Sequence, residues 1–349
     1  MNNNSFFSTE ILRWFRENGR DLPWRETRDP YAIWLSEIIL QQTRIAQGWE
    51  YWERFMQTYP KVEDLAAASE DDVLKLWQGL GYYSRARNLH TAAKQIVALG
   101  DFPNTLEGIK SLKGVGDYTA AAIGSFAFDI PAAVVDGNVY RVLSRYFGID
   151  TPINSTQGKK EFAALAQSLL PASDAASYNQ GMMDFGAIQC TPQSPKCLLC
   201  PLAETCEALR CGRVEELPVK NKTVKVKTRH LSYIYIRCKS SAADGIGKSE
   251  PMVAIHRRGE GDIWQGLWEP YNVSDVKELP SFVKNPILLA KDVKHVLTHR
   301  ILLADFYLLG TESRPPLPDD YIWIKESEIE DYGVPRLIEI MLEKINSAE

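Results

Sequence analysis

The spacing of apolar residues changes near residue 213, and the change separates two kinds of secondary structure along the chain. Up to about residue 210, apolar residues recur at intervals of three and four, which is typical of amphipathic helices. Helix start and end signals punctuate this part, namely Asp29-Pro30, Ser69 with Asp72, and Gly100. Beyond residue 229 the sequence is rich in β-branched and aromatic residues. We therefore expect a multidomain protein in which an all-α part precedes an α+β part.

The predicted domains of the 349-residue chain follow this change of pattern. Domains of roughly 100 to 200 residues are usual, so two domains are expected. We assign residues 1–213 to a helical domain, 214–229 to a basic interdomain linker and 230–349 to the second domain. The linker has five basic and two acidic residues and lacks helical periodicity. Three strands and a last helix are predicted in the second domain, at Leu231–Arg237, Met252–His256, Ile301–Tyr307 and Val334–Ile345.

Net charge restricts how such a chain can bind nucleic acid. The formal charge is −5 and only the linker is net basic, so any contact with DNA must be local. No stretch approaches the roughly 18 apolar residues that a membrane span needs. Met1 to Ser8 lacks the pattern of a secretory signal, so we expect a cytoplasmic, nucleoid-associated protein without a membrane partner.

A first motif fits a helix-hairpin-helix over residues 105–127, with Gly114 and Gly116 in the hairpin. Glycines allow a tight turn, and their backbone N–H groups can approach a DNA phosphate beside the positive end of the next helix. The alternative is an ordinary turn between helices. The small-residue helix that follows favours the DNA-binding interpretation.

Two carboxylates are candidates for chemistry. Asp136 follows an apolar run and, with Asn138, begins a helix, so it is either a simple N-cap or an anion fixed by helix-end amides. The two roles are compatible. Glu37 lies in an apolar helix with Trp34, where desolvation would raise its pKa and allow general-acid catalysis; an exposed Glu on a helix is the alternative. Hydrolysis of a glycosidic bond calls for one protonated acid and one charged carboxylate.

Four cysteines form a cluster with spacings of six, two and five residues, at Cys190, Cys197, Cys200 and Cys206. Such clustering in a reducing compartment indicates a metal site and not a disulfide scaffold. Four thiolates suit tetrahedral zinc or a [4Fe-4S] cluster. The single close pair with long flanking spacers is unlike the two short pairs of most zinc sites. No role is assigned to Cys211 or Cys238.

These motifs together resemble the adenine-specific mismatch DNA glycosylases, the MutY family of the endonuclease III superfamily. The resemblance covers nearly all of the chain. It implies a [4Fe-4S] cluster on the loop 190–206, a monovalent cation at the hairpin, and a monomeric enzyme. Its substrate would be double-stranded DNA that contains 8-oxoguanine:A or G:A mispairs, from which it would hydrolyse the N-glycosidic bond of adenine.

The resemblance also implies roles for single residues. Glu37 would protonate adenine N7, Asp136 would stabilise the anomeric carbon, and Tyr118 and Asn138 would support the site. Tyr118 stands where glycosylase/lyases carry the Schiff-base lysine, so base release without strand cleavage is expected. The implied DNA and substrate contacts are Trp24 and Arg25 at the adenine pocket, Asp184 where many relatives have Glu, Gln42 and Tyr82 as wedges, and Arg85 and Arg87 as phosphate contacts.

The second domain resembles the Nudix-like recognition domain of the same family, with Ile263-Trp264-Gln-Gly266-Leu-Trp268-Glu as its landmark. It lacks the acidic Nudix box that binds Mg²⁺, so base recognition is expected in place of nucleotide hydrolysis. The aligned recognition segment is Leu297-Thr298-His299, where relatives commonly have Phe-Ser-His; a plain β-hairpin surface is the alternative. The alternatives for the whole chain are a thymine or uracil mismatch glycosylase and a non-catalytic iron–sulfur DNA-binding protein.

Overall fold

Local start signals set the helices of the first part. Asp29 caps α2 (Pro30–Ile39) by accepting a hydrogen bond from the Tyr31 N–H at 3.0 Å. Ser69 caps α5 (Glu70–Leu76) in the same way, although the Asp72 carboxylate bonds to the Ser69 hydroxyl and not to the Ser69 N–H. Gly100 ends α6 (Ser84–Leu99) with a left-handed φ of 86°. The predicted helix boundaries at these residues are confirmed.

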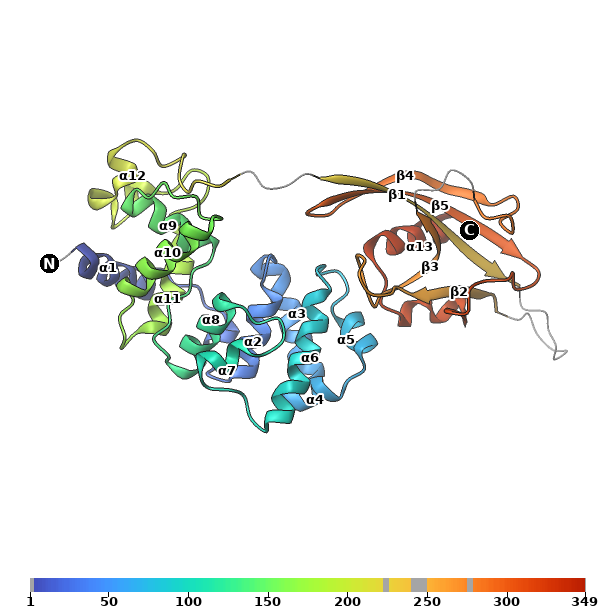
Figure 1. Cartoon of the computed structure of the whole chain (residues 1–349), viewed down its shortest axis with the longest axis horizontal. Helices are drawn as coiled ribbons and strands as arrows, with labels where there is room; N and C mark the ends of the chain where they lie inside the picture. Colours follow the sequence, from blue (N-terminus) through green and yellow to red (C-terminus); the bar gives the residue numbers. More distant parts are fainter. Residues whose placement is uncertain (1–2, 222–225, 240–249, 275–278, 349) are drawn as a thin grey trace. The chain divides into compact units, whose positions relative to one another are not determined.

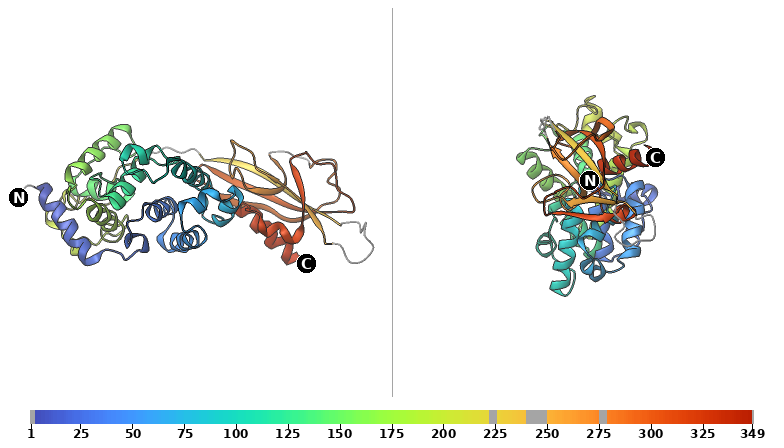
Figure 2. Two further views of the ribbon diagram at one scale, coloured as in Figure 1. Left: turned by 90° about the horizontal axis from the view of Figure 1, so that it is seen from below. Right: turned by 90° about the vertical axis from the view of Figure 1, so that its right-hand side faces the viewer.

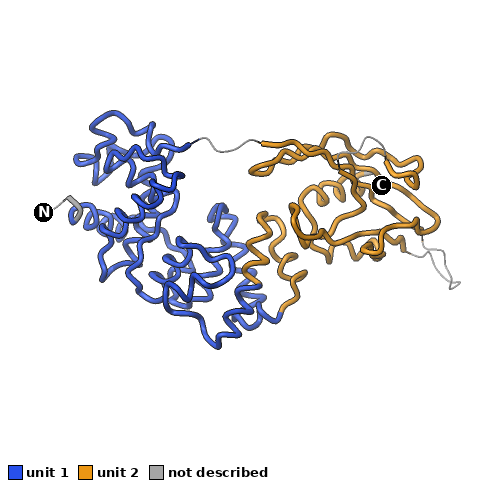
Figure 3. Tube along the Cα trace, viewed as in Figure 1, with its two compact units in different colours: residues 1–67, 91–222 blue, residues 68–90, 223–349 orange. Residues whose placement is uncertain are grey.

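The computed structural model describes residues 3–221, 226–239, 250–274 and 279–348. The chain divides into two compact units, residues 1–67 with 91–222, and residues 68–90 with 223–349 (Figure 3). Residues 68–90 thus pack with the carboxy-terminal half, whereas the sequence pattern assigned them to the helical domain. The predicted limits of the linker stay a prediction; within that range, the first strand begins at Lys227.

The first unit is built from helices, as predicted (Figure 1). Its core joins apolar side chains of the first and ninth helices, including Phe7, Trp14 and Tyr146. The helices besides α2 are α1 (Asn3–Asn18), α3 (Ile45–Thr58), α4 (Val62–Ala67), the second part of α6, α7 (Leu106–Lys110), α8 (Asp117–Phe128), α9 (Gly137–Phe147), α10 (Thr156–Leu169), α11 (Ala175–Asp184) and α12 (Glu207–Arg210). Short helical turns lie at Pro23–Arg25, Phe185–Gln189, Cys197–Leu199 and Ala203–Thr205. Within the described part of the chain, no helix is both long and apolar enough to cross a bilayer.

The second unit contains a mixed six-stranded sheet in the order β4-β5-β1-β3-β2-β6. Only β1 and β5 pair in parallel; the other neighbours are antiparallel. The strands are β1 (Lys227–Cys238), β2 (Met252–Arg257), β3 (Trp268–Ser274), β4 (Ile287–Val296), β5 (Arg300–Thr311) and β6 (Tyr321–Lys325). The helix α13 (Arg336–Ala348) covers one face of the sheet (Figure 2). The predicted fold class is confirmed, with β3, β4 and β6 missed.

Candidate functional site

The helix-hairpin-helix is present in the first unit. The chain turns between α7 and α8, Gly114 has a φ of 79°, and the Val115 N–H donates to the Leu112 carbonyl at 3.1 Å. Gly116 precedes the first residue of α8, and nothing lies within 4 Å of the place where a Cβ would stand. Both glycines are exposed. An extended anion can therefore approach the backbone at the start of α8.

Glu37 is buried on α2, with 6% of its surface exposed. The Tyr118 hydroxyl on α8 donates to Glu37 Oε2 at 2.8 Å. Burial, and to a smaller extent the charge of Asp136, raises the pKa of Glu37 to about 7, although the Tyr118 hydrogen bond and the charge of Arg25 lower it. A substantial fraction of the carboxyl group therefore stays protonated near neutral pH. The exposed-helix alternative for Glu37 is wrong.

Asp136 is the N-cap of α9, as predicted. Its Oδ1 accepts from the Val139 N–H and its Oδ2 from Asn138 Nδ2, both at 2.7 Å. Burial nevertheless raises the pKa of Asp136 above its ordinary value, against the effect of these hydrogen bonds and of the Arg141 charge. The helix-end amides predicted from the sequence are thus present, and burial acts against their effect on the pKa.

The two carboxyl groups interact but have unequal surroundings. Glu37 accepts a bond from Tyr118, whereas Asp136 has two hydrogen-bond donors and a nearby guanidinium. Hydrogen bonds to the charged form favour ionisation, so Asp136 loses its proton first and its charge then helps Glu37 to keep one. Such a pair supplies one acid and one anion at the same pH.

The raised pKa of Glu37 has a measurable effect on stability. Between its ordinary pKa of 4.5 and about 7, the unfolded chain releases a proton that the folded chain retains, so rising pH destabilises the fold. Glu37→Gln cannot titrate at this position. We therefore expect the difference in unfolding free energy, variant minus native chain, to be about 2 to 3 kcal/mol larger at pH 8 than at pH 5. Denaturant unfolding of both proteins at the two pH values measures this. An equal difference at both would mean that Glu37 has an ordinary pKa.

Arg141 is a site residue that the motif analysis did not single out. Its Nη2 donates to Asn138 Oδ1 at 2.8 Å and to the Gly186 carbonyl at 2.6 Å, and its Nε donates to the Cys190 carbonyl at 2.8 Å. These bonds fix the amide of Asn138 so that its N–H₂ group faces Asp136. Gly186 must be small, because a Cβ there would lie 2.6 Å from Asn138 Cβ. The sequence signal for Arg141 is a charged residue three positions after Asn138 on the apolar face of α9.

Arg25 is fixed by Asp184, which has no exposed surface. The Arg25 guanidinium makes two bonds to the Asp184 carboxylate, at 2.8 and 2.9 Å, and the Arg20 side chain and N–H also bond to it. Burial alone would raise the pKa of Asp184, but these bonds bring it below its ordinary value. The oxygens of Asp184 are thus engaged by two arginines, and Asp184 positions Arg25; its contact with a substrate edge stays a prediction.

Trp24 packs in an aromatic cluster, and its contact at the adenine pocket stays a prediction. It is 6% exposed and packs edge-on against Trp49 and Trp52, with ring centroids 5.8 and 5.6 Å apart. Trp52 Nε1 donates to the Ala32 carbonyl, which ties this cluster to α2. The aromatic cluster thus supports the helix that carries Glu37, and Trp24 itself is enclosed in the core.

The two predicted wedge residues share an unusual backbone. Gln42 in the first unit and Tyr82 in the second have φ values of 57° and 47°, in the left-handed region that non-glycine residues rarely adopt. Both side chains are exposed, Tyr82 by 47%. Exposed side chains on a strained backbone are common at sites that contact ligands. The wedge roles stay predictions that these observations support.

Arg85 and Arg87 follow Tyr82 but do not extend freely into solvent. Arg85 is 8% exposed, lies 5.0 Å from the Trp77 ring centroid and donates to the Gly81 carbonyl at 3.3 Å. Burial lowers its pKa to about 10. This side chain stabilises the turn before Tyr82, and its phosphate contact stays a prediction. Arg87 Nη1 donates to the Gln265 carbonyl at 2.6 Å, so part of its guanidinium group is hydrogen-bonded within the second unit.

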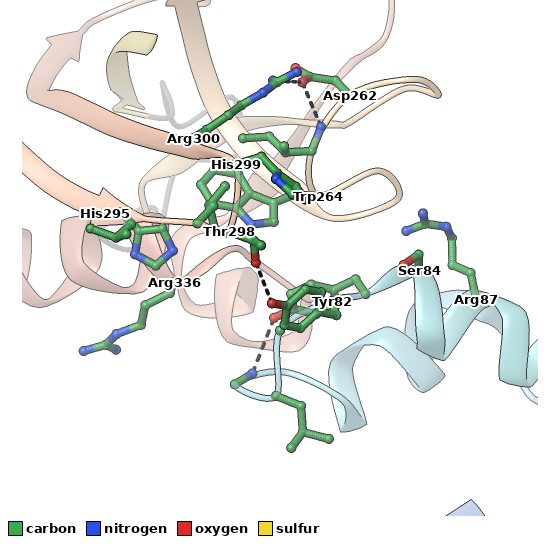
Figure 4. Close-up of a pocket in the computed structure, with 17 residues that line it drawn as sticks. Tyr82, Ser84, Arg87, Asp262, Trp264, His295, Thr298, His299, Arg300 and Arg336 are labelled. Atoms are coloured by element: carbon green, nitrogen blue, oxygen red, sulfur yellow. Dashed lines mark hydrogen bonds and ion pairs between the residues drawn. The ribbon is translucent and has the colours of Figure 1, made fainter. Parts of the chain in front are cut away.

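The predicted recognition segment lines an open cavity in the second unit, of about 710 Å³ (Figure 4). Leu297, Thr298 and His299 form the turn between β4 and β5, which closes with the Leu297 N–H bonded to the Arg300 carbonyl at 2.8 Å. Tyr82 faces the same cavity, and its hydroxyl lies 2.6 Å from Thr298 Oγ1. Leu297 is partly buried against the core under the sheet. The segment is thus a β-hairpin, and the structure brings it together with Tyr82.

The four clustered cysteines line a small common space of about 30 Å³. Arg145 also borders it, with Nη1 3.4 Å from Cys190 Sγ, and Cys206 Sγ lies 3.5 Å from the Arg145 carbonyl. In the described ranges, no three His, Cys, Asp or Glu side chains converge closely enough for a single metal ion. Four thiols around one space, with a guanidinium beside them, suit a cluster whose iron atoms each take one ligand.

Comparisons with known proteins agree with this arrangement. Family models match three parts of the chain: the HhH-GPD superfamily base excision DNA repair protein at residues 35–171, the iron-sulfur binding domain of endonuclease III at 190–206, and a NUDIX domain at 246–344. An adenine DNA glycosylase of Buchnera aphidicola subsp. Schizaphis graminum is 30% identical over 355 residues, which cover 97% of this chain and 98% of the relative. The chain belongs to the adenine DNA glycosylase family. The match over 190–206 begins and ends on a cysteine of the set, and this family member holds a [4Fe-4S] cluster there.

Other members of the adenine DNA glycosylase family are longer. The Mus musculus adenine DNA glycosylase is 43% identical over 226 residues, which cover 61% of this chain and 44% of the mouse protein. The structure of a thermostable thymine-DNA glycosylase is 34% identical, with a TM-score of 0.56, over 60% of this chain and 97% of that one. The helical fold is therefore shared with a glycosylase that is named for another base, thymine. The choice of base must come from particular residues.

Proposed function

We propose that this chain is a base-excision repair enzyme that hydrolyses the N-glycosidic bond of adenine mispaired with 8-oxoguanine or guanine in double-stranded DNA. The observation that carries the proposal is the pair of unlike carboxyl groups: Glu37 has a pKa near 7, and Asp136 is fixed as a helix cap. Membership of the adenine DNA glycosylase family supports adenine as the released base. The alternative of a non-catalytic DNA-binding protein leaves both groups unexplained.

In the proposed reaction, Glu37 donates its proton to N7 of adenine and so makes the base a better leaving group. The Tyr118 hydroxyl holds Oε2 by donating to it, which leaves the other carboxyl oxygen to carry the proton. As the bond breaks, positive charge develops on the sugar, and the Asp136 carboxylate stabilises it. A water molecule then adds to the anomeric carbon and releases a proton, which completes the hydrolysis. Asn138, which Arg141 orients, keeps that carboxylate in place.

The same residues support base release without strand cleavage. A lyase needs an amine that attacks the sugar, and the position two residues after Gly116 carries the phenol of Tyr118. That phenol is engaged with Glu37, and burial raises its pKa well above the ordinary value. Tyr118 therefore stays neutral and acts as a hydrogen-bond donor to the acid.

The remaining assignments concern DNA and the cofactor. The exposed hairpin glycines are proposed to bind a phosphate, with a monovalent cation nearby, and Gln42 and Tyr82 to enter the duplex beside the flipped nucleotide. Thr298 is proposed to bond to the base opposite adenine. The [4Fe-4S] cluster, when bound through the thiolates of Cys190, Cys197, Cys200 and Cys206, would tie the loop 190–206 into one rigid piece. The active species is proposed to be a monomer.

A single-turnover assay on matched duplexes tests the function. Adenine is placed opposite 8-oxoguanine, guanine or thymine, and a fourth duplex carries T:G. We expect the fastest adenine release from 8-oxoguanine:A, slower release from G:A, and negligible release from A:T. Release of thymine from T:G would favour the mismatch thymine glycosylase suggested by the structural relative. Equal adenine release from A:T would overturn the proposal.

A further inference from the structure

The second-unit cavity contains an indole ring that the proposed function does not use. Trp264 lies on the loop between β2 and β3 and lines the same cavity as Tyr82 and Thr298 (Figure 4). Its φ is 60°, which is costly for a bulky residue and persists only where surrounding contacts enforce it. The loop has therefore been fixed in a conformation that turns this side chain toward the cavity.

Arg258 fixes the loop that carries Trp264. It is 7% exposed, and its Nη1 bonds to both carboxylate oxygens of the buried Glu269 at 2.6 Å. Its Nε donates to the Ile263 carbonyl at 2.8 Å, and its Cζ lies 5.8 Å from the Trp264 ring centroid. The Leu267 N–H closes the loop onto the Trp264 carbonyl at 3.0 Å. The indole is thus preorganised, so a ligand that stacks on it would lose little side-chain entropy.

The other walls of the cavity indicate what such a ligand is. Thr298 and Tyr82 offer hydroxyl groups. The guanidinium groups of Arg300 and Arg336 also line the cavity, the first paired with Asp262 and the second with Glu339 and Glu343. The hairpin itself offers no large ring at its first position, because Leu297 is aliphatic and packs into the core. A flat aromatic surface, hydroxyl groups and cations together suit a nucleobase attached to a phosphate backbone. Trp264 has the largest aromatic surface among the residues that line this cavity.

We propose that Trp264 is a specificity-determining residue, the surface on which the base opposite the excised adenine stacks while Thr298 bonds to its edge. The proposal rests on the proposed function, because it assigns the opposite base to this cavity. It explains how a chain with Leu297 in the hairpin still provides an aromatic contact: the ring comes from a separate loop, two strands earlier in the chain.

Equilibrium binding tests the role of Trp264 separately from catalysis. All proteins carry Glu37→Gln, so no base is released, and each is titrated with duplexes that hold 8-oxoguanine, or an abasic site, opposite adenine. Trp264→Leu is expected to weaken binding to the 8-oxoguanine duplex about tenfold and to leave binding to the abasic duplex unchanged, since no base is there to stack. Trp264→Phe, which keeps a ring, should retain most of the affinity.

Two further variants control the experiment. Trp268→Leu makes the same change at a tryptophan that packs on Tyr332 and does not line the cavity, so it should bind both duplexes normally. Adding Leu297→Phe to Trp264→Leu should restore part of the lost affinity by supplying a ring from the hairpin. An equal loss on both duplexes, or no loss on either, would overturn the assignment. Failure of the proposed function would appear separately, as absent adenine release by the native chain.

Discussion

Glu37→Gln is expected to slow adenine release by about 1000-fold, within the range of 10²–10⁴ that a general acid supplies. The amide oxygen of Gln can still accept the bond from Tyr118 that Glu37 Oε2 accepts at 2.8 Å, so the site keeps its shape. What is lost is the proton for the leaving base. Single-turnover release from an 8-oxoguanine:A duplex measures the effect, and the equilibrium affinity for the same duplex should stay close to the native value.

The pH dependence of the native chain gives an independent check on the acid. Only the protonated form of Glu37 can donate, and its pKa is about 7, so the release rate should be level below that pH and fall about tenfold per pH unit well above it. The residual rate of Glu37→Gln should lack this fall. Glu63→Gln, an exposed change in the same unit, should behave as the native chain. If Glu37→Gln releases adenine as fast as the native chain, Glu37 is not the general acid.

Asp136→Asn is expected to slow adenine release by 10²–10³-fold, the usual effect of removing one preorganised electrostatic group. Asparagine caps helices as well as aspartate does, so its side-chain oxygen can still accept from the Val139 N–H. Its N–H₂ group would replace the oxygen that accepts from Asn138 Nδ2, so the thermal unfolding temperature should fall by a few degrees. The negative charge that faces the developing sugar cation is absent. Single-turnover rates and thermal melting of the same samples separate the two effects.

The Asp136→Asn variant also tests the coupling between the two carboxyl groups. The Asp136 charge is one cause of the raised pKa of Glu37, so its removal should move the alkaline fall of the residual release rate to lower pH. Gly137→Ala is a neighbouring control with open space around its Cβ. If Asp136→Asn releases adenine at the native rate, the assigned role is refuted. It is also refuted if the variant loses its thermal stability while its folded molecules keep the native rate.

Local signals predicted those parts of the fold that depend on neighbouring residues. Asp29, Ser69 and Gly100 mark helix ends through contacts within a few positions, so the sequence alone sufficed. Three strands were missed for physical reasons. Pro270 interrupts the pattern of β3, bulges near Ala290 break the alternation of β4, and the short β6 pairs only with β2. Residues 68–90 group with the second unit through long-range contacts, such as Arg257 with Glu70, that no periodicity reveals.

The candidate site divides in the same way. Glu37 and Asp136 were found because an acid in an apolar helix and an acid before a helix are visible in the sequence. The partners of Asp184 were not, because Arg20 and Arg25 lie about 160 positions away along the chain. Arg85 was predicted to contact a phosphate because its segment resembles the family, and only the structure shows that its guanidinium packs on the Trp77 ring. Sequence patterns locate reactive groups. Which other side chains bind those groups depends on the tertiary structure.

The membership of residues 68–90 in the second unit affects how the chain is made. This segment leaves the ribosome early, yet the strands and the helix α13 that it packs with are the last to be synthesised. The central pairing of that unit, β1 with β5, joins residues such as Tyr233 and Phe306 and is also non-local. During translation the first unit can close as soon as residue 222 has emerged, while the segment around Leu74 must wait. A nascent chain that stalls before its final helix would therefore present an early apolar surface to chaperones and proteases.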